Sequence, residues 1–196
     1  MTIPNSITSL GDYVFHNCRS LTNVTIPSSV TRIDYAAFAG CTLLSTITIP
    51  RSVTYIKPHA FANCTSLTSV TIPSGVTSID NCAFLYCTSL TNVTIPNSVT
   101  SIGSQAFEGC IRLSSVTIPS SVTLIVVLAF TGCTNLTSVY FKGNAPSLGG
   151  DDVFAGADKV KIHYLPGTTG WTNTFGGRPT AIWKPETNAP TPGVLP

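Results

Sequence analysis

Apolar and polar residues alternate in a pattern that returns every 23 residues along most of the chain. Within one unit, Val24 and Ile26 alternate with polar residues, which is the period of a strand with one buried side. Pro27 ends this strand, because proline has no N–H to donate to a strand ladder. Val30 and Ile33 follow as a second short apolar piece, spaced to turn inward again after the corner.

The rest of each unit predicts a single turn of helix. Asp34 is a good N-cap ahead of residues 35–39, and Gly40 can take the left-handed conformation that closes a helical turn. The same closing position is held in other units by Asn17, Asn63, Gly109 and Gly132. Each unit is therefore expected to form a strand, a proline corner, a short extended piece and one helical turn.

Several columns of identical residues keep this register. They are Phe15, Phe38, Phe61, Phe84, Phe107 and Phe130; Cys18, Cys41, Cys64, Cys87, Cys110 and Cys133; and Leu21, Leu44, Leu67, Leu90, Leu113 and Leu136. One unit cannot bury its own apolar side, so the units must stack. The sequence predicts a repeat solenoid with a parallel β-sheet on one face and short extended pieces and single-turn helices on the other.

The spacing Leu-x-x-Val-x-Ile, preceded by Phe-x-x-Cys, resembles the leucine-rich repeats of the BspA-like family over about residues 2–141. The resemblance implies a right-handed superhelix and a role in adhesion or protein binding. It also implies an extracellular or cell-surface location, although the sequence has no segment typical of a signal peptide. The family has no shared catalytic residues to carry over, and it implies no cofactor.

The pattern divides the chain into three parts. Residues 1–142 are expected to form about six repeats of the solenoid, residues 143–184 an atypical last rung with a C-terminal cap, and residues 185–196 a Pro-rich tail or linker. Val160, Ile162 and Tyr164 predict the last strand.

Three large aromatic residues follow that strand. Trp171, Phe175 and Trp183 are expected to cover the open end of the core, because a terminal repeat has no further neighbour to bury it. The alternative is that Trp171 and Trp183 form an aromatic platform for a sugar.

Charge and composition exclude several functions. Charged residues make up only 9% of the chain and the net charge is +2, with no run of lysines or arginines. This balance gives no reason to expect a nucleic-acid partner. No apolar stretch approaches the ~18 residues that span a bilayer, so no membrane insertion is expected.

The residues that could carry chemistry do not converge. The cysteine column is expected to stay reduced, with each thiol packed as a small buried hydrophobe. Cys82 occupies a column of mixed polarity and is therefore the candidate for an accessible thiol, with His59 and Gln105 one rung away. No third group orients the histidine, so catalysis is not predicted. A zinc site is not predicted either, because the cysteines lie along a line and do not converge on a point.

The outward side of the predicted sheet is the candidate binding surface. Its residues form two columns of hydroxyls and amides that end in one aromatic residue: Asn23, Thr46, Ser69, Asn92, Ser115 and Ser138 beside Thr25, Thr48, Thr71, Thr94, Thr117 and Tyr140. These columns could bind a protein or a glycan. Alternatively, threonine is simply a good strand former that repeat copying has propagated.

The sixth unit breaks the pattern, because Val126, Val127 and Leu128 occupy a turn that is polar elsewhere. Exposed apolar clusters tend to mark contact surfaces. The C-terminal cap with Trp171 and Trp183 is expected to cover this cluster; the alternative is a homodimer contact.

These observations favour a non-enzymatic module for adhesion or protein binding. Two other classes of function stay open. One is a structural spacer of a larger surface protein, and the other is polysaccharide or ice binding through the threonine columns.

Overall fold

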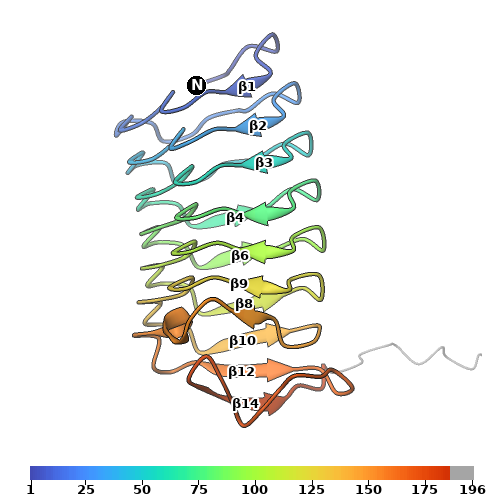
Figure 1. Cartoon of the computed structure of the whole chain (residues 1–196). Coiled ribbons are helices and arrows are strands. Elements are labelled where there is room, and N and C mark those ends of the chain that lie inside the picture. Colours follow the sequence, from blue (N-terminus) through green and yellow to red (C-terminus); the bar gives the residue numbers. More distant parts are fainter. Residues whose placement is uncertain (186–196) are drawn as a thin grey trace, which may run out of the picture.

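Two parallel ladders of short strands run the length of a stacked coil (Figure 1), of which the computed structural model describes residues 1–185. The first, the strand ladder, is the line of β4 (Ser69–Thr71), β6 (Asn92–Thr94), β8 (Ser115–Ile118), β10 (Ser138–Phe141), β12 (Lys161–Tyr164) and β14 (Arg178–Ile182). It is hydrogen-bonded as two sheets, β4 with β6 and β8 through β14, and β6 packs next to β8. Isolated bridges between Thr2, Thr25 and Thr48 extend it to the first rung. The second ladder is the line of β1 (Ser9–Leu10), β2 (Arg32–Ile33), β3 (Tyr55–Ile56), β5 (Ser78–Ile79), β7 (Ser101–Ile102), β9 (Leu124–Ile125) and β11 (Ser147–Leu148). It is hydrogen-bonded as two sheets, β1 through β3 and β5 through β11, and β3 packs next to β5.

Neighbouring rungs are offset by one repeat, so equivalent residues stack on one another. Val70 lies opposite Val93 in the strand ladder, and Ile79 lies opposite Ile102 in the second ladder. The predicted strand and the short extended piece of each repeat therefore both form parallel pairs, and the predicted solenoid is confirmed.

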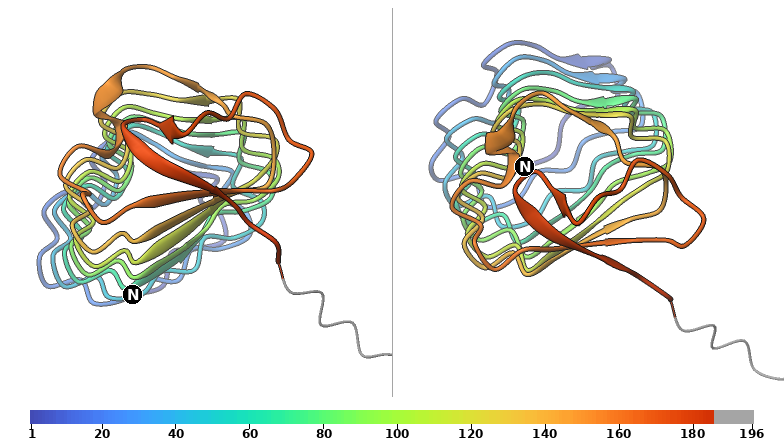
Figure 2. Two further views of the ribbon diagram at one scale, coloured as in Figure 1. Left: turned by 90° about the horizontal axis from the view of Figure 1, so that it is seen from below. Right: turned by 60° about the horizontal axis from the view of Figure 1, so that its bottom comes forward.

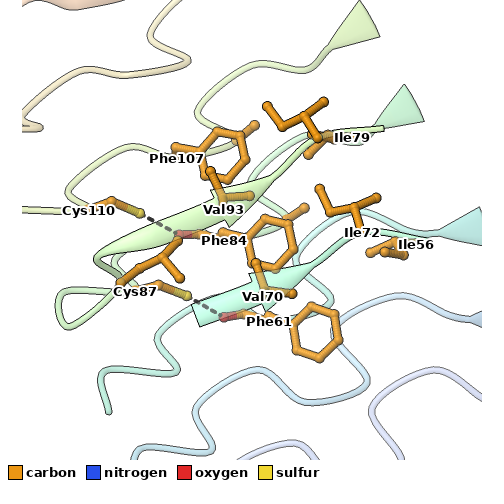
Figure 3. Close-up of a cluster of buried hydrophobic side chains, with 14 of the residues drawn as sticks. Ile56, Phe61, Val70, Ile72, Ile79, Phe84, Cys87, Val93, Phe107 and Cys110 are labelled. Carbon is orange, nitrogen blue, oxygen red and sulfur yellow. Dashed lines mark hydrogen bonds between the residues drawn. The ribbon is translucent and has the colours of Figure 1, made fainter. Parts of the chain in front are cut away.

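The core lies inside the coil, where the apolar columns meet (Figure 3). Phe84 stacks between Phe61 and Phe107, with ring centroids 5.4 Å apart on each side and interplanar angles of 5°. Val93 and Ile79 are also buried, as the alternating pattern predicts. The side of each strand that the sequence assigns to the core is the buried one.

The turns differ from the prediction, because they are not helical. In the second unit Ala36 has a φ of 49° and Gly40 a φ of 75°, and a left-handed residue so early in the turn interrupts any right-handed helix. The N–H of Phe38 donates to the carbonyl of Ala60 on the next rung at 2.8 Å, so it is not available for a helical bond. Among the described residues only η1 (Asp151–Phe154), a 3-10 helix, is helical. Stacking between rungs replaces the predicted single-turn helices.

The stack continues beyond the regular repeats. Phe154 stacks on Phe130 at 5.7 Å although it comes one residue late in the sequence, and β12 forms where the last strand was predicted. It is not the last strand, because β14 pairs with it in parallel. The short β13 (Thr174–Phe175) then pairs antiparallel with β14. The expected tail at 185–196 lies outside the described residues, apart from Pro185.

This final segment crosses the open end of the coil (Figure 2). Trp171 stacks on Tyr164 at 5.0 Å and contacts Phe141 at 4.9 Å, and its indole N–H donates to Thr168. Phe175 lies 5.0 Å from Trp171, and both rings pack against the core. Both rings therefore pack against the end of the core.

Candidate functional site

The outward face of the strand ladder is formed by the side chains that alternate with its buried positions. In β6, Asn92 and Thr94 are exposed while Val93 between them is buried. β8 and β10 repeat the alternation, with Tyr140 half-buried on the outward side. The candidate binding residues therefore share one face, as predicted.

Two classes of hydroxyl differ in their hydrogen bonds. Threonines between the ladders donate to the preceding rung: Thr100 Oγ1 to the Thr77 carbonyl and Thr91 Oγ1 to the Thr68 carbonyl, both at 3.1 Å. On the outward face, Thr94 makes no side-chain hydrogen bond within the described residues. The first class stabilises the stack, whereas the second remains free for an external partner.

Two shallow cavities lie along this face. The larger, of about 540 Å³, follows the proline corners and includes Thr48, Thr71, Arg51 and Pro73. The smaller, of about 280 Å³, is lined by the polar side chains of Asn92, Thr94, Ser115, Thr117, Asn97 and Lys142. The face is thus hollowed at two places, and the second hollow is the more polar.

An aromatic cluster occupies the same face at its C-terminal end. Tyr140 stacks on His163 at 4.8 Å, and its ring centroid lies 4.9 Å from that of Trp183. Trp183 therefore does not cover the core as predicted: it follows β14 and packs against the outward face instead. The proposed platform of Trp171 with Trp183 is also wrong, because Trp171 contacts the cap.

His163 was missed by the sequence reasoning, although it lies one repeat after Tyr140 in the register of β10 and β12. Partial burial lowers the pKa of His163, and the neighbouring Lys161 ammonium lowers it further. The imidazole is therefore neutral at neutral pH.

A second aromatic cluster lies on the turns of the first rungs. Tyr13 contacts Tyr35 at 5.3 Å and His16 at 5.4 Å, and Tyr35 contacts His59 at 5.3 Å. The sequence reasoning missed this cluster: Tyr13 and His59 share the column of Cys82, but Tyr35 and His16 come from two other columns. Desolvation raises the pKa of the exposed Tyr13 hydroxyl, and the neighbouring Tyr35 raises it further.

Cys82 is not the accessible thiol that its column predicts. It is only 6% exposed, and its Sγ lies 3.6 Å from Gln105 Oε1 on the next rung. The Gln105 amide is held in turn by Glu108 at 2.7 Å. A small side chain in this column is covered by longer neighbours, and burial raises the pKa of the Cys82 thiol. Cys18 on the first rung is the exposed cysteine.

The cysteine column forms a ladder of buried donors (Figure 3). The thiol of Cys87 donates to the carbonyl of Phe61 at 3.2 Å, and that of Cys110 to the carbonyl of Phe84 at 3.3 Å. Burial raises the pKa of both thiols well above the ordinary value. These cysteines are therefore packed as buried thiols, as the sequence predicts, and are poor nucleophiles.

The apolar turn of the sixth unit is partly buried by the next rung. A Cβ on Gly149 would lie 3.0 Å from Val126 Cα, and one on Gly150 would lie 3.3 Å from Val127 Cγ2. Val126, Val127 and Leu128 are each half-buried. The predicted cover by Trp171 and Trp183 is wrong, since both rings pack elsewhere. The homodimer contact stays a prediction.

Acidic and metal-binding groups are scattered. Within residues 1–185, no three His, Cys, Asp or Glu side chains come together as a metal site. Asp158 pairs with Arg178 at 2.9 Å, and Asp34 pairs with Arg32 at 3.0 Å. The same described range contains no helix long and apolar enough to cross a membrane.

Comparisons with known proteins agree with this geometry. The family model of the BspA type leucine rich repeat region matches residues 1–81 and 55–173, with six copies. A comparison with curated proteins finds no match.

Two solved leucine-rich repeat proteins are similar to the chain. One, from Eubacterium ventriosum ATCC 27560, is 26% identical with a TM-score of 0.67, and the match covers 95% of this chain and 44% of that one. The other, from Bacteroides ovatus ATCC 8483, is 26% identical with a TM-score of 0.53, and the match covers 83% of this chain and 54% of that one. The chain spans about half the length of these two proteins. Because the family model covers most of the chain, the chain belongs to the BspA-type leucine-rich repeat family.

Proposed function

We propose that the chain is a non-enzymatic binding module that recognises a partner through the outward face of the strand ladder. The contrast between the two classes of hydroxyl carries the proposal. Thr100 donates its hydroxyl to the neighbouring rung, whereas Thr94 keeps its hydroxyl open on a rigid face. A face whose polar groups are fixed by stacked backbone loses little conformational freedom when it binds.

Membership of the BspA-type family supports a role in adhesion at a cell surface. The outward face fits this role, because it is continuous over the rungs and carries two cavities of about 540 and 280 Å³. A structural spacer would need neither the free hydroxyls nor the hollows.

Adhesion of coated beads tests the proposal. Beads that carry the chain are applied to surfaces coated with mucin, collagen or plant and bacterial polysaccharides, and attachment is measured against soluble chain as competitor. We expect saturable attachment to at least one surface. The double variant Thr94→Arg with Thr117→Arg, which places two large side chains on the face, is expected to reduce it at least tenfold.

The matched control places the same side chains on the second ladder, as Ser101→Arg with Leu124→Arg. Both residues point outward there, with Leu124 38% exposed. We expect this control to retain attachment. Loss with the control and retention with Thr94→Arg and Thr117→Arg would contradict the proposal, and the absence of saturable attachment would favour a spacer.

A further inference from the structure

We propose that the C-terminal end of the outward face is a site for a carboxylate-bearing oligosaccharide, formed by Tyr140, His163, Trp183, Lys142 and Lys161. This inference rests on the proposed function, because it assigns a ligand class to one part of the same face. These five residues form the C-terminal site.

The three rings provide a rigid apolar platform. Tyr140 and His163 stack with an interplanar angle of 22°, and Trp183 is tilted against Tyr140 by 53°. The backbone N–H of Trp183 donates to the carbonyl of Tyr164 at 2.7 Å, which fixes the backbone of Trp183 to the strand ladder. Aromatic rings with one wet side are favoured at binding surfaces, and a flat ring matches the C–H face of a pyranose.

The charge around the platform is positive. Lys161 is two residues before His163 on the outward side of β12, and Lys142 lines the adjacent cavity. No described Asp or Glu lies among the outward positions of β8, β10, β12 or β14. Because His163 is neutral at neutral pH, the two ammonium groups carry the charge and complement a carboxylate.

The adjacent cavity supplies hydrogen bonds for hydroxyl groups. It has a volume of about 280 Å³ and is lined by Asn92, Thr94, Ser115 and Thr117 beside Lys142. Thr117 is in register with Tyr140, so the cavity and the platform are continuous across neighbouring strands. A ligand that covers both must carry apolar ring faces and many hydroxyls, which is the chemistry of an oligosaccharide.

The same end of the ladder is closed to an added peptide strand. The outer edge of β14 pairs antiparallel with β13, with Phe175 opposite Arg178 and Thr174 opposite Pro179. A peptide that binds by strand addition needs a free edge, and β13 already covers Arg178 and Pro179 at the start of β14. The rings and ammonium groups of the C-terminal site are side chains, which favours recognition of an oligosaccharide over backbone pairing with an extended peptide.

Binding of tetragalacturonate, a chain of four carboxylate-bearing sugars, tests the site against maltotetraose, a neutral chain of the same length. In Trp171→Phe the remaining tryptophan of the chain is Trp183, so a saturable change in its fluorescence reports this site. We expect such a change with tetragalacturonate and at least tenfold weaker binding of maltotetraose.

By calorimetry, Trp183→Ala and the double variant Lys142→Gln with Lys161→Gln are each expected to weaken tetragalacturonate binding at least tenfold. Trp183→Phe, which keeps a flat ring, is expected to remain within about threefold of the unchanged chain.

The second ladder offers a matched control. Lys57 Nζ lies 5.5 Å from the ring of Tyr55, which is 57% exposed, so this pair has the same chemistry on another face. Tyr55→Ala with Lys57→Gln is expected to leave tetragalacturonate binding unchanged, and circular dichroism checks that every variant is folded.

The inference is overturned if folded chain does not bind tetragalacturonate, if maltotetraose binds equally well, or if the control weakens binding as much as Trp183→Ala. In another outcome, coated beads attach to a protein surface and lose this attachment in Thr94→Arg with Thr117→Arg, while the chain does not bind tetragalacturonate. In that case the proposed function stands and only the oligosaccharide is wrong.

Discussion

The two ends of the solenoid both continue the phenylalanine column but differ in burial. On the first rung Phe15 is half-buried, Cys18 is exposed and Val14 is 48% exposed. At the other end Phe154 and Ala157 are fully buried, and the final segment lies over Phe154, where the Arg178 side chain donates to the Phe154 carbonyl at 2.7 Å. The position of a side chain in the repeat selects its direction, whereas its burial depends on a neighbour on each side.

The largest effect on stability is expected from removing a ring of the phenylalanine column. Phe84 is fully buried between two rings, so Phe84→Ala should lower the free energy of unfolding by about 3–5 kcal/mol. Phe15→Ala removes a half-buried ring at the open end and should cost roughly 1–2 kcal/mol. Urea unfolding of both variants measures the difference. Equal losses would show that the first rung is covered in solution.

The cap should contribute less than the column. Trp171 is partly exposed but contacts Phe141, Tyr164 and Phe175. Trp171→Ala should therefore lower the free energy of unfolding by roughly 2–4 kcal/mol. Hydrogen exchange should show faster opening of β12 and β14 than of β6. Unchanged exchange in these strands would contradict the role of Trp171 as the lid of the core.

One column of the repeat holds valine on the first rung and alanine on the next five, so alanine and valine can be exchanged at the open end and in the middle of the stack. Its members are Val14, Ala37, Ala60, Ala83, Ala106 and Ala129. Ala83 is fully buried in the middle of the stack, so Ala83→Val overpacks the turn and should cost about 1–3 kcal/mol. Val14 occupies the equivalent position at the open end and is 48% exposed, so Val14→Ala should change stability by less than about 0.5 kcal/mol. Thermal melts of the two variants check the prediction, and a large loss for Val14→Ala would show that a partner covers the first rung.

The regular part of the fold follows from the sequence because each apolar column has one physical role. The alternation around Val93 specifies which side of β6 is buried, and the proline after Ile95 ends the strand. The turns did not follow, since Asp34 and Gly40 are compatible with a helix as well as with the observed turn. The bonds that decide between them, such as Phe38 N–H to the Ala60 carbonyl, join different rungs and have no signal within one repeat.

The candidate site could be predicted only in part. The outward columns of hydroxyls follow from strand periodicity, and His163 could have been found by adding one repeat to Tyr140. Trp183 could not be placed, because β13 and β14 lie outside the repeat and their path across the end is set by tertiary contacts. The exposure of Cys82 was wrong for a similar reason: its cover comes from the Gln105 and Glu108 side chains of another rung.

A clear difference in thiol reactivity is expected between the cysteines at the open end and those in the middle. Cys18 is exposed, whereas Cys110 is fully buried and donates to the Phe84 carbonyl at 3.3 Å. At about pH 8 a thiol reagent should label Cys18 in the folded chain, and Cys110 only after unfolding.

Burial raises the pKa of Cys41 to about 11 and that of Cys133 to about 12. An unfolded thiol loses its proton near pH 8.5, so above that pH the unfolded chain binds fewer protons than the folded chain and stability must fall as the pH rises. The stability due to the buried thiols is thus fully present below about pH 8.5 and is lost progressively as the pH rises toward their folded pKa values. Urea midpoints at rising pH measure this loss, and Cys18→Ser, which removes only the exposed thiol, should leave the pH profile unchanged. Rapid labelling of Cys110 in the folded chain, or a midpoint that rises with pH in this range, would contradict the buried ladder.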